Sequence, residues 1–182
     1  MNARRPSTSL APRQTSALRA QRNTLGHVTR TELEAALDRA RAELVRAVEP
    51  LTDEQSRRRL VPSLTTPIAL LKHCAAAERV WFQRTIGGIE ESRCDGYARG
   101  DDGGWMVPES QTLAEVIAEF EAACARSREI AKTTAMDDVF EHRLLGSVTY
   151  AWICLHMIAE LGRHAGHADI LVEQILAADK PR

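Results

Sequence analysis

Apolar residues recur at every third or fourth position in four stretches of the chain, which is the period of a helix that buries one face. The first stretch carries the stripe Leu33, Leu37, Ala40, Leu44, Val48 and Leu51. Together the stripes predict helices over about residues 30–49, 67–86, 113–132 and 150–178. We therefore expect an all-α protein, a four-helix bundle with long interhelical loops.

A threonine stands just before each predicted helix. Threonine caps a helix here because its hydroxyl oxygen accepts a hydrogen bond from a free backbone N–H of the first turn. Thr29 and Thr112 are each followed three residues later by a glutamate, the spacing of a capping box. Thr66 precedes Pro67, a residue suited to a first helical turn, and Thr149 precedes the last helix. These signals predict the helix starts.

The connections between the predicted helices are long. Loops of the length of 87–108 often serve as lids or binding edges, and Tyr97 and Trp105 in this loop could either close over a site or only pin the loop down. A second loop, 133–147, could fold back as a short extended segment. Three arginines at 57–59 could meet an anionic ligand at a pocket mouth, or form a solvated face.

Length and composition indicate one domain. The chain has 182 residues, 44% of them hydrophobic, and no apolar run reaches the roughly eighteen residues of a membrane span. The four cysteines (Cys74, Cys94, Cys124 and Cys154) form no CxxC pair, and no apolar signal-peptide core is present. We expect a cytoplasmic protein with reduced thiols, of which Cys124 and Cys154 are buried apolar residues.

The first 28 residues differ from the rest. Residues 1–30 contain six arginines and no acidic residue, so the remaining residues sum to −7 in a chain of net charge −1. We expect a disordered basic arm over 1–28 and a bundle domain over 29–182. The arm resembles a transit segment in composition, although a solvated arm or an early translation start explains it as well. Because clustered basic residues with interleaved aromatics are absent, we expect no nucleic-acid partner.

One face of the last predicted helix carries His156, Glu160, His164 and His167. Steps of four, four and three residues place these side chains within a strip roughly 80° wide. Ile153 and Leu171 share the strip, so we expect it to face the core. Imidazoles and a carboxylate at this spacing can bind one divalent cation.

His73 is the candidate for a further protein ligand from another helix. On the second predicted helix it shares a side with Leu70, Ala77, Val80 and Trp81. This pattern indicates that His73 also faces inward. His27 in the arm and His142 in a charged loop lack this setting.

The combination of these residues indicates a metal site. An unpaired buried carboxylate such as Glu160 is costly, and its neighbours on the strip are histidines rather than lysine or arginine. A cation would relieve that cost. Alternatives stay open for two residues: His167 could replace Glu160 as a ligand, and His156 could orient Glu160, touch a substrate or be an ordinary core histidine.

With His73 on an early helix and Glu160 and His164 on the last, the chain resembles the DinB/YfiT-like superfamily of metal-binding four-helix bundles over about residues 31–178. The runs LVPSLTTPIALLKHCAAAERVWF and HMIAELGRHAGHADIL are similar to its DinB_2-like branch. Most of the superfamily has three histidine ligands. Glu160 in the place of the second is similar to the mycothiol-dependent maleylpyruvate isomerase branch. The resemblance implies the metal ligands His73, Glu160 and His164, with zinc expected first and nickel or iron as alternatives.

The resemblance also implies a function, because several relatives are S-transferases or isomerases that use mycothiol, bacillithiol or glutathione. We expect a metal-dependent enzyme that activates such a thiol, or water, against a small electrophile, in an S-transferase or isomerase-like detoxification. The alternative is a non-catalytic, stress-induced metal-binding bundle that acts as a binding or dimerisation module. Small residues at Ala159, Gly162 and Gly166 would let another helix of the bundle, or of a homodimer partner, approach closely.

Overall fold

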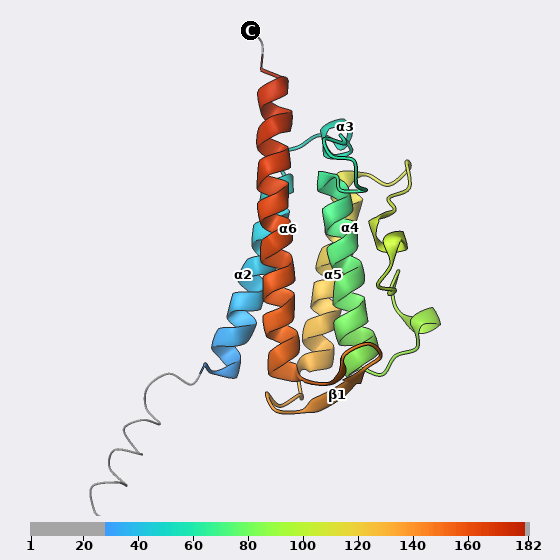
Figure 1. The fold of residues 1–182 in the computed structure, drawn as a ribbon, viewed down its shortest axis with the longest axis vertical. Helices are drawn as coiled ribbons and strands as arrows, with labels where there is room; N and C mark the ends of the chain where they lie inside the picture. Colours follow the sequence, from blue (N-terminus) through green and yellow to red (C-terminus); the bar gives the residue numbers. More distant parts are fainter. Residues whose placement is uncertain (1–27, 181–182) are drawn as a thin grey trace, which may run out of the picture.

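Four long helices lie side by side in the computed structural model, which describes residues 28–180 (Figure 1). They are α2 (Arg30–Val48), α4 (Pro67–Glu78) with its continuation η1 (Arg79–Ile86), α5 (Leu113–Ala131) and α6 (Tyr150–Ala178). The connections contain α3 (Asp53–Ser56), the 3-10 turns η2 (Glu91–Arg93) and η3 (Asp102–Trp105), and the strands β1 (Val139–His142) and β2 (Gly146–Thr149). The predicted all-α fold class is confirmed.

The predicted caps fix the helix starts. The Thr29 hydroxyl accepts a hydrogen bond from the backbone N–H of Glu32, and the Glu32 carboxylate accepts one from the backbone N–H of Thr29 at 2.8 Å. Thr112 forms the same kind of box at α5, and Thr66 and Thr149 cap α4 and α6. Since such caps depend only on neighbouring residues, the sequence locates them well.

The second predicted helix changes its winding half-way along. From Arg79 it continues as the π-helix η1, and the N–H of Gly87 bonds to the carbonyl five residues earlier at 2.9 Å. The change falls between two buried charged residues. Glu78 pairs with Arg41 of α2, whereas Arg79 pairs with Asp95 of the following loop. The apolar stripe alone did not reveal this change, because it continues through both kinds of helix.

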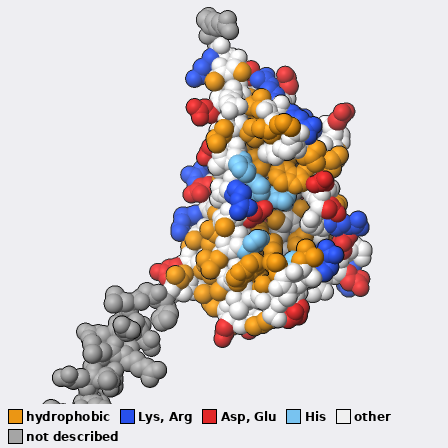
Figure 2. Space-filling model, viewed as in Figure 1, with side chains coloured by type: hydrophobic (Ala, Val, Ile, Leu, Met, Phe, Trp, Pro, Cys, Tyr) orange, Lys and Arg blue, Asp and Glu red, His pale blue; other side chains and the backbone are white. Residues whose placement is uncertain are grey.

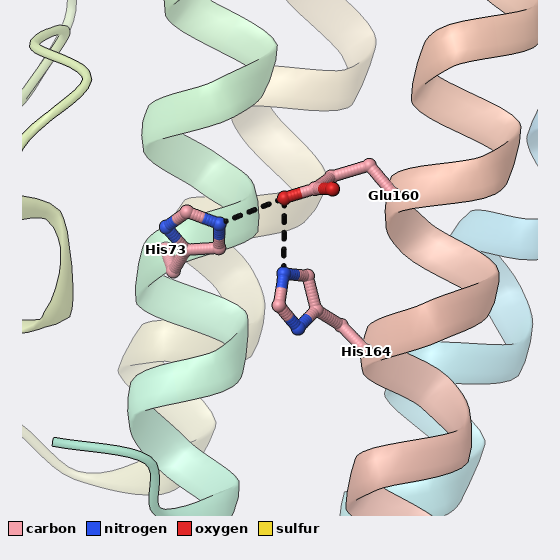
Figure 3. A group of neighbouring side chains, drawn as sticks. All are labelled: His73, Glu160 and His164. Carbon is pink, nitrogen blue, oxygen red and sulfur yellow. Dashed lines mark hydrogen bonds and ion pairs between the residues drawn. The ribbon is translucent and has the colours of Figure 1, made fainter. Parts of the chain in front are cut away.

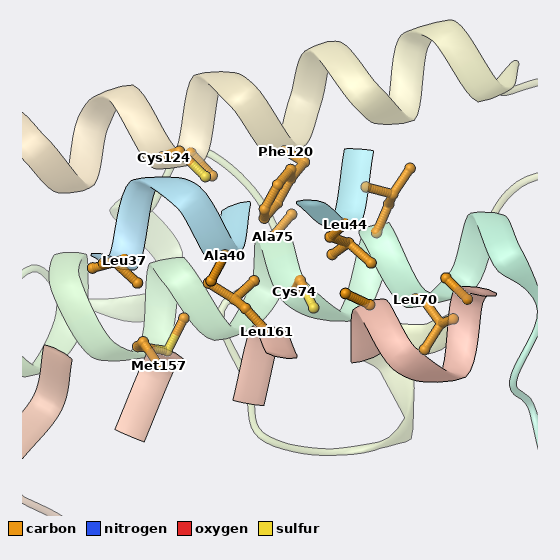
Figure 4. Packing of buried hydrophobic residues seen from close by; sticks show 14 of the residues in the cluster. Leu37, Ala40, Leu44, Leu70, Cys74, Ala75, Phe120, Cys124, Met157 and Leu161 are labelled. Atoms are coloured by element: carbon orange, nitrogen blue, oxygen red, sulfur yellow. The ribbon is translucent and has the colours of Figure 1, made fainter. Parts of the chain in front are cut away.

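The hydrophobic core lies between the four long helices (Figure 4). It includes Leu37 and Leu44 of α2, Leu70 of α4, Phe120 of α5 and Leu161 of α6. One ion pair is enclosed beside it: Nε and a terminal nitrogen of Arg41 donate to the two carboxylate oxygens of Glu78 at 2.9 and 2.7 Å. Glu78 is fully buried, and the paired contacts offset the desolvation of both charges.

The connection between α5 and α6 folds back as predicted. β1 and β2 pair in antiparallel fashion, with Val139 opposite Thr149 and His142 opposite Gly146. Gly146 has a φ of 71°, a left-handed conformation that glycine adopts without strain. The hairpin packs below the lower ends of η1 and α6 (Figure 1).

The loop 87–108 is held to the bundle at several points. Arg79 binds Asp95 at 2.6 Å, and Arg84 donates to a loop carbonyl at 2.8 Å. A Cβ on Gly96 would lie 2.5 Å from the guanidinium carbon of Arg79, so a larger residue there would require the Arg79 side chain to move away from the loop. The loop therefore forms a fixed wall along α4.

The three arginines considered for an anionic ligand hold the chain itself together. Arg57 donates to the carbonyl of Pro108 at 2.9 Å, and Arg58 pairs with Asp179 at 2.6 Å. Arg59 donates to a backbone carbonyl four residues further on at 2.6 Å.

Three further predictions concern the outside of the molecule. The predicted arm, apart from Val28, lies outside the described residues, as does His27. Within residues 28–180, no helix is long and apolar enough to cross a membrane. Nothing lies within 4 Å of a Cβ built on Gly162 or Gly166, so no other helix of the described chain packs closely there. The homodimer and the domain limits 29–182 stay predictions.

Candidate metal centre

Three of the predicted side chains converge between α4 and α6 (Figure 3). His73 comes from α4, and Glu160 and His164 come from successive turns of α6. Oε1 of Glu160 lies 3.1 Å from Nε2 of His73 and 3.0 Å from Nε2 of His164. One donor atom from each residue lies within 4.8 Å of the other two. The fold thus gathers two imidazoles and a carboxylate from helices far apart in sequence.

Glu160 is held in its ionised form. Hydrogen bonds with His164 and His73 keep the pKa of its carboxyl group well below the ordinary value, against the opposing effect of partial burial. Its second oxygen accepts a hydrogen bond from Arg163 at 2.8 Å. Arg163 lies beside the histidine strip rather than on it, and its i, i+3 spacing from Glu160 is a known pairing signal. The sequence argument considered only the strip and did not include this partner.

The donor set fits a divalent cation that takes imidazole and carboxylate ligands. In a tetrahedral site with bonds of about 2.0–2.1 Å, ligand atoms lie roughly 3.3 Å apart. The N···O separations of 3.0 and 3.1 Å here are close to that. His164 is buried, and its Nδ1 has no hydrogen-bond partner among residues 28–180. Packing rather than a second hydrogen bond therefore aims Nε2 of His164 at Glu160.

Cys74 does not belong to this group, although it follows His73 in sequence. Its side chain is fully buried in the core, and this burial raises the pKa of the thiol. Cys124 and Cys154 are buried as expected, and burial raises the pKa of Cys154 to about 11. All four cysteines are unpaired.

A comparison with protein families shows where this arrangement belongs. The model of the mycothiol-S-transferase family matches residues 32–177. The chain belongs to this family. Because this is a DinB-like family, the resemblance seen in the sequence is confirmed.

A solved structure shows the same fold. The crystal structure of a protein described as "the conserved protein of locus from Enterococcus faecalis" matches with a TM-score of 0.64 at 13% sequence identity. The match covers 84% of this chain and 99% of that chain. No functionally curated protein matches the chain.

In this member of the mycothiol S-transferase family, part of the predicted histidine strip is buried in the core and part is exposed to solvent. His164 is only 6% exposed, whereas His167 is exposed and His156 half-buried. The expectation that the whole strip faces the core is therefore wrong for His167. In helical projection His156 and His167 lie about 60–80° from His164, on the solvent side. His167 also lies outside the group of converging donor atoms.

His156 and His142 belong to an aromatic cluster instead. His156 stacks on Trp152 with ring centroids 5.1 Å apart, and its ring lies 4.6 Å from that of Trp81. His142 stacks on Trp81 at 4.4 Å. Partial burial lowers the pKa of both imidazoles. Among residues 28–180 no hydrogen bond joins His156 to Glu160, so His156 does not orient that carboxylate through a direct bond.

Trp105 covers the group of His73, Glu160 and His164 from the side of the long loop. Its ring stacks on His73 with centroids 4.1 Å apart and an interplanar angle of 12°, and its edge meets His164 at 5.6 Å. A Cβ on the preceding Gly104 would lie 3.3 Å from Ala76, so the loop backbone runs close to α4 here. Trp105 was expected either to close over a site or only to pin the loop down. In the structure it lies against His73 and His164, whereas Arg79 and Arg84 hold the loop to the bundle. Tyr97 hydrogen-bonds to Asp101 within the loop.

Proposed function

We propose that this protein is a metal-dependent S-transferase that activates a low-molecular-weight thiol, mycothiol in the first instance, for attack on a small electrophile. The observation that carries the proposal is the convergence of His73, Glu160 and His164 in a chain of the mycothiol S-transferase family. Three protein donors leave a coordination position for an external ligand, as in catalytic zinc sites. We propose zinc as the ion, with nickel or iron as alternatives.

The residues around the centre have defined parts in such a reaction. A divalent ion held there would supply one thing, a lowered pKa for a thiol that it binds, so that the nucleophilic thiolate persists at neutral pH. Glu160 contributes one negative charge beside two imidazoles, and Arg163 holds its second oxygen. Trp105 shields His73 from water.

The bond changes of the proposed transfer are simple. The thiol gives up its proton to solvent. Its sulfur then donates an electron pair to an electrophilic carbon of the second substrate, and a carbon–sulfur bond forms. The bond from that carbon to the leaving group breaks, and its electron pair departs with that group.

Calorimetry of thiol binding tests the proposal. Mycothiol, bacillithiol and glutathione are titrated into metal-loaded and metal-free protein, in two buffers of different ionisation enthalpy. We expect mycothiol to bind only in the presence of metal, because the open coordination position is its attachment point. Binding should release a proton and tighten as pH rises toward the ordinary thiol pKa of about 8.5.

The matched control is the double variant His73→Ala, His164→Ala, which lacks both imidazoles and should bind no thiol under the same conditions. If none of the three thiols shows metal-dependent binding to the intact protein, the thiol proposal is rejected. A water-activating enzyme and a non-catalytic metal-binding module would then be the readings to test.

A further inference from the structure

A pocket of about 280 Å³ lies beside the candidate metal-binding residues. It is lined by Val61, Ser63, Thr65, His167, Ile170 and Leu171. The first three residues lie in the segment before α4, and the last three belong to α6. None of the three converging donor residues belongs to this lining.

His167 links this pocket to the metal centre. Its ring centroid lies 5.6 Å from that of His164, which is three residues earlier on α6. His167 is exposed and lines the pocket, whereas His164 is buried and faces Glu160. Figure 2 shows imidazoles in the middle of this face of the molecule with hydrophobic side chains around them. A ligand in the pocket would therefore have one end close to His164 and the other candidate metal ligands.

The lining favours apolar groups over polyols and ions. Val61, Ile170 and Leu171 are aliphatic, and the hydroxyl of Ser63 donates to that of Thr65 at 3.0 Å. The lining contains no acidic residue, lysine or arginine. A sugar or inositol placed there would lose water without gaining enough hydrogen bonds, which is unfavourable. A phenyl or short alkyl group would gain from the removal of apolar surface from water.

The size of the pocket points the same way. Its 280 Å³ is just below the roughly 300–1,000 Å³ of pockets for drug-sized ligands, so it suits part of a molecule. Apolar surface continues beyond it, because Leu60 is 43% exposed and Leu64 is 38% exposed. The pocket can therefore hold an apolar group of a larger ligand. The rest of that ligand would lie outside the pocket, on the side of His167 and His164.

From these observations we infer that the pocket holds an apolar substituent, aryl or short alkyl, of the electrophilic substrate. The electrophilic carbon then lies on the His167 side, facing the metal-binding group. The role as an electrophile subsite rests on the proposed function, whereas the preference for an apolar ligand does not. His167 is the junction between the two sites rather than a metal ligand.

Methyl NMR tests the pocket without metal, thiol or turnover. Protein labelled with ¹³C at the isoleucine δ-methyl groups is titrated with benzyl alcohol, an unreactive aryl probe, and with myo-inositol as the polyol. The Ile170 signal is the one missing from the Ile170→Asp variant. The control is Leu155→Asp, because Leu155 on the same helix is 58% exposed and Ile170 is 57% exposed. Both side chains are on the surface, and circular dichroism checks that both variants fold.

We expect benzyl alcohol to shift the Ile170 signal and myo-inositol to leave it unchanged. Measured on the benzyl alcohol signals, because the Ile170→Asp variant lacks the Ile170 methyl, Ile170→Asp should weaken binding roughly tenfold, the scale of discrimination by a small apolar pocket, and Leu155→Asp should not change it. An unmoved Ile170 signal, equal losses in the two variants, or equal binding of the polyol would overturn the inference. Thiol and metal binding are measured separately, so this result and the proposed function can fail independently.

Discussion

The Glu160 carboxylate contacts three side chains, two through one oxygen and the third through the other. Oε1 lies between the imidazoles of His73 and His164, and Oε2 accepts from Arg163. Arg163 is 61% exposed in its side chain, so this pair by itself contributes little to stability. Its effect is to orient Glu160 with Oε1 turned to the imidazoles. The orientation of the Glu160 carboxylate thus depends on a surface residue as well as on the core.

The metal content of histidine variants tests this site residue by residue. Purified protein should contain about one divalent ion per chain, and His164→Ala should lose it because a nitrogen donor is removed. His167→Ala is the matched control, since His167 lies on the same helix but outside the converging donors, and it should retain the ion. Elemental analysis measures both. Stoichiometric metal in the His73→Ala, His164→Ala double variant would show that the ion binds elsewhere.

Trp105 should affect metal affinity without binding metal. Its indole fixes the His73 ring by stacking, so Trp105→Leu should raise the metal dissociation constant about tenfold, the scale seen when support for a ligand is lost. Trp105→Phe keeps an aromatic face and should restore most of the affinity. Competition with a chromophoric chelator measures the constant. The control is Trp152→Leu, which removes a tryptophan that stacks on His156 instead. Equal affinities for Trp105→Leu and the unaltered protein would contradict this role.

The helical projection placed His73, Glu160 and His164 correctly on inward faces. It did not predict that His167 is exposed or that Trp105 stacks on His73, and both failures have a physical cause. Spacing places side chains around a helix, but it does not show where the edge of the core falls. Here the edge separates His164 from His167, only three residues away. Trp105 reaches His73 through a loop whose path depends on close approach at Gly104, which no periodicity encodes.

At the scale of elements, a charged network joins α4 and η1 to α5. Glu119 of α5 accepts from Lys72 at 2.6 Å and from Arg79 at 3.0 Å. Burial alone would raise the pKa of Glu119, but hydrogen bonds from Lys72 and Gln111 outweigh it and bring the pKa below its ordinary value of about 4.5. Glu119 therefore holds two segments of one long helix to its neighbour.

The lowered pKa of Glu119 predicts a loss of stability in acid. Because the folded chain releases this proton more readily than the unfolded chain, the stabilisation is complete above about pH 4.5 and is lost as pH falls through the folded-state pKa. Glu119→Gln should lower the unfolding free energy by about 1–2 kcal/mol at pH 7 and reduce its slope below pH 4.5. Urea titrations at several pH values measure both quantities.

The control for this experiment is Glu54→Gln, because the Glu54 side chain is 87% exposed and lies 3.8 Å from Arg58. Its stability curve should follow that of the unaltered protein. If Glu119→Gln has the same acid slope as the unaltered protein, Glu119 does not carry this linkage.

Predictability also differs between elements. The helix starts follow from threonine caps and adjacent residues, so sequence locates them well. The π-helical winding of η1 coincides with the buried pair of Glu78 with Arg41 and with the pair of buried Arg79 with partly exposed Asp95. These partners lie outside the helix, 37 and 16 residues away in the chain. Local pattern carries no information about such partners, and the winding was missed for that reason.

At the scale of the whole molecule, the family match over residues 32–177 and the bundle over Arg30–Ala178 nearly coincide. We propose that residues 29–182 form the functional domain. Deleting residues 1–27 should then leave the melting temperature within a few degrees, because the deleted segment offers few large apolar side chains to bury and precedes the Thr29 cap. Thermal denaturation of the two proteins compares them. A large drop would show that this segment contributes to the folded bundle.

The donors His73 and Glu160 are 87 positions apart in the chain and lie on different helices. An ion bound to both would therefore act as a cross-link that closes a long loop and exists only in the folded state. A hundredfold excess of free ion over its dissociation constant would add about 2.7 kcal/mol to the folding equilibrium. Metal supply would then shift the fraction of unfolded protein that is open to proteolysis.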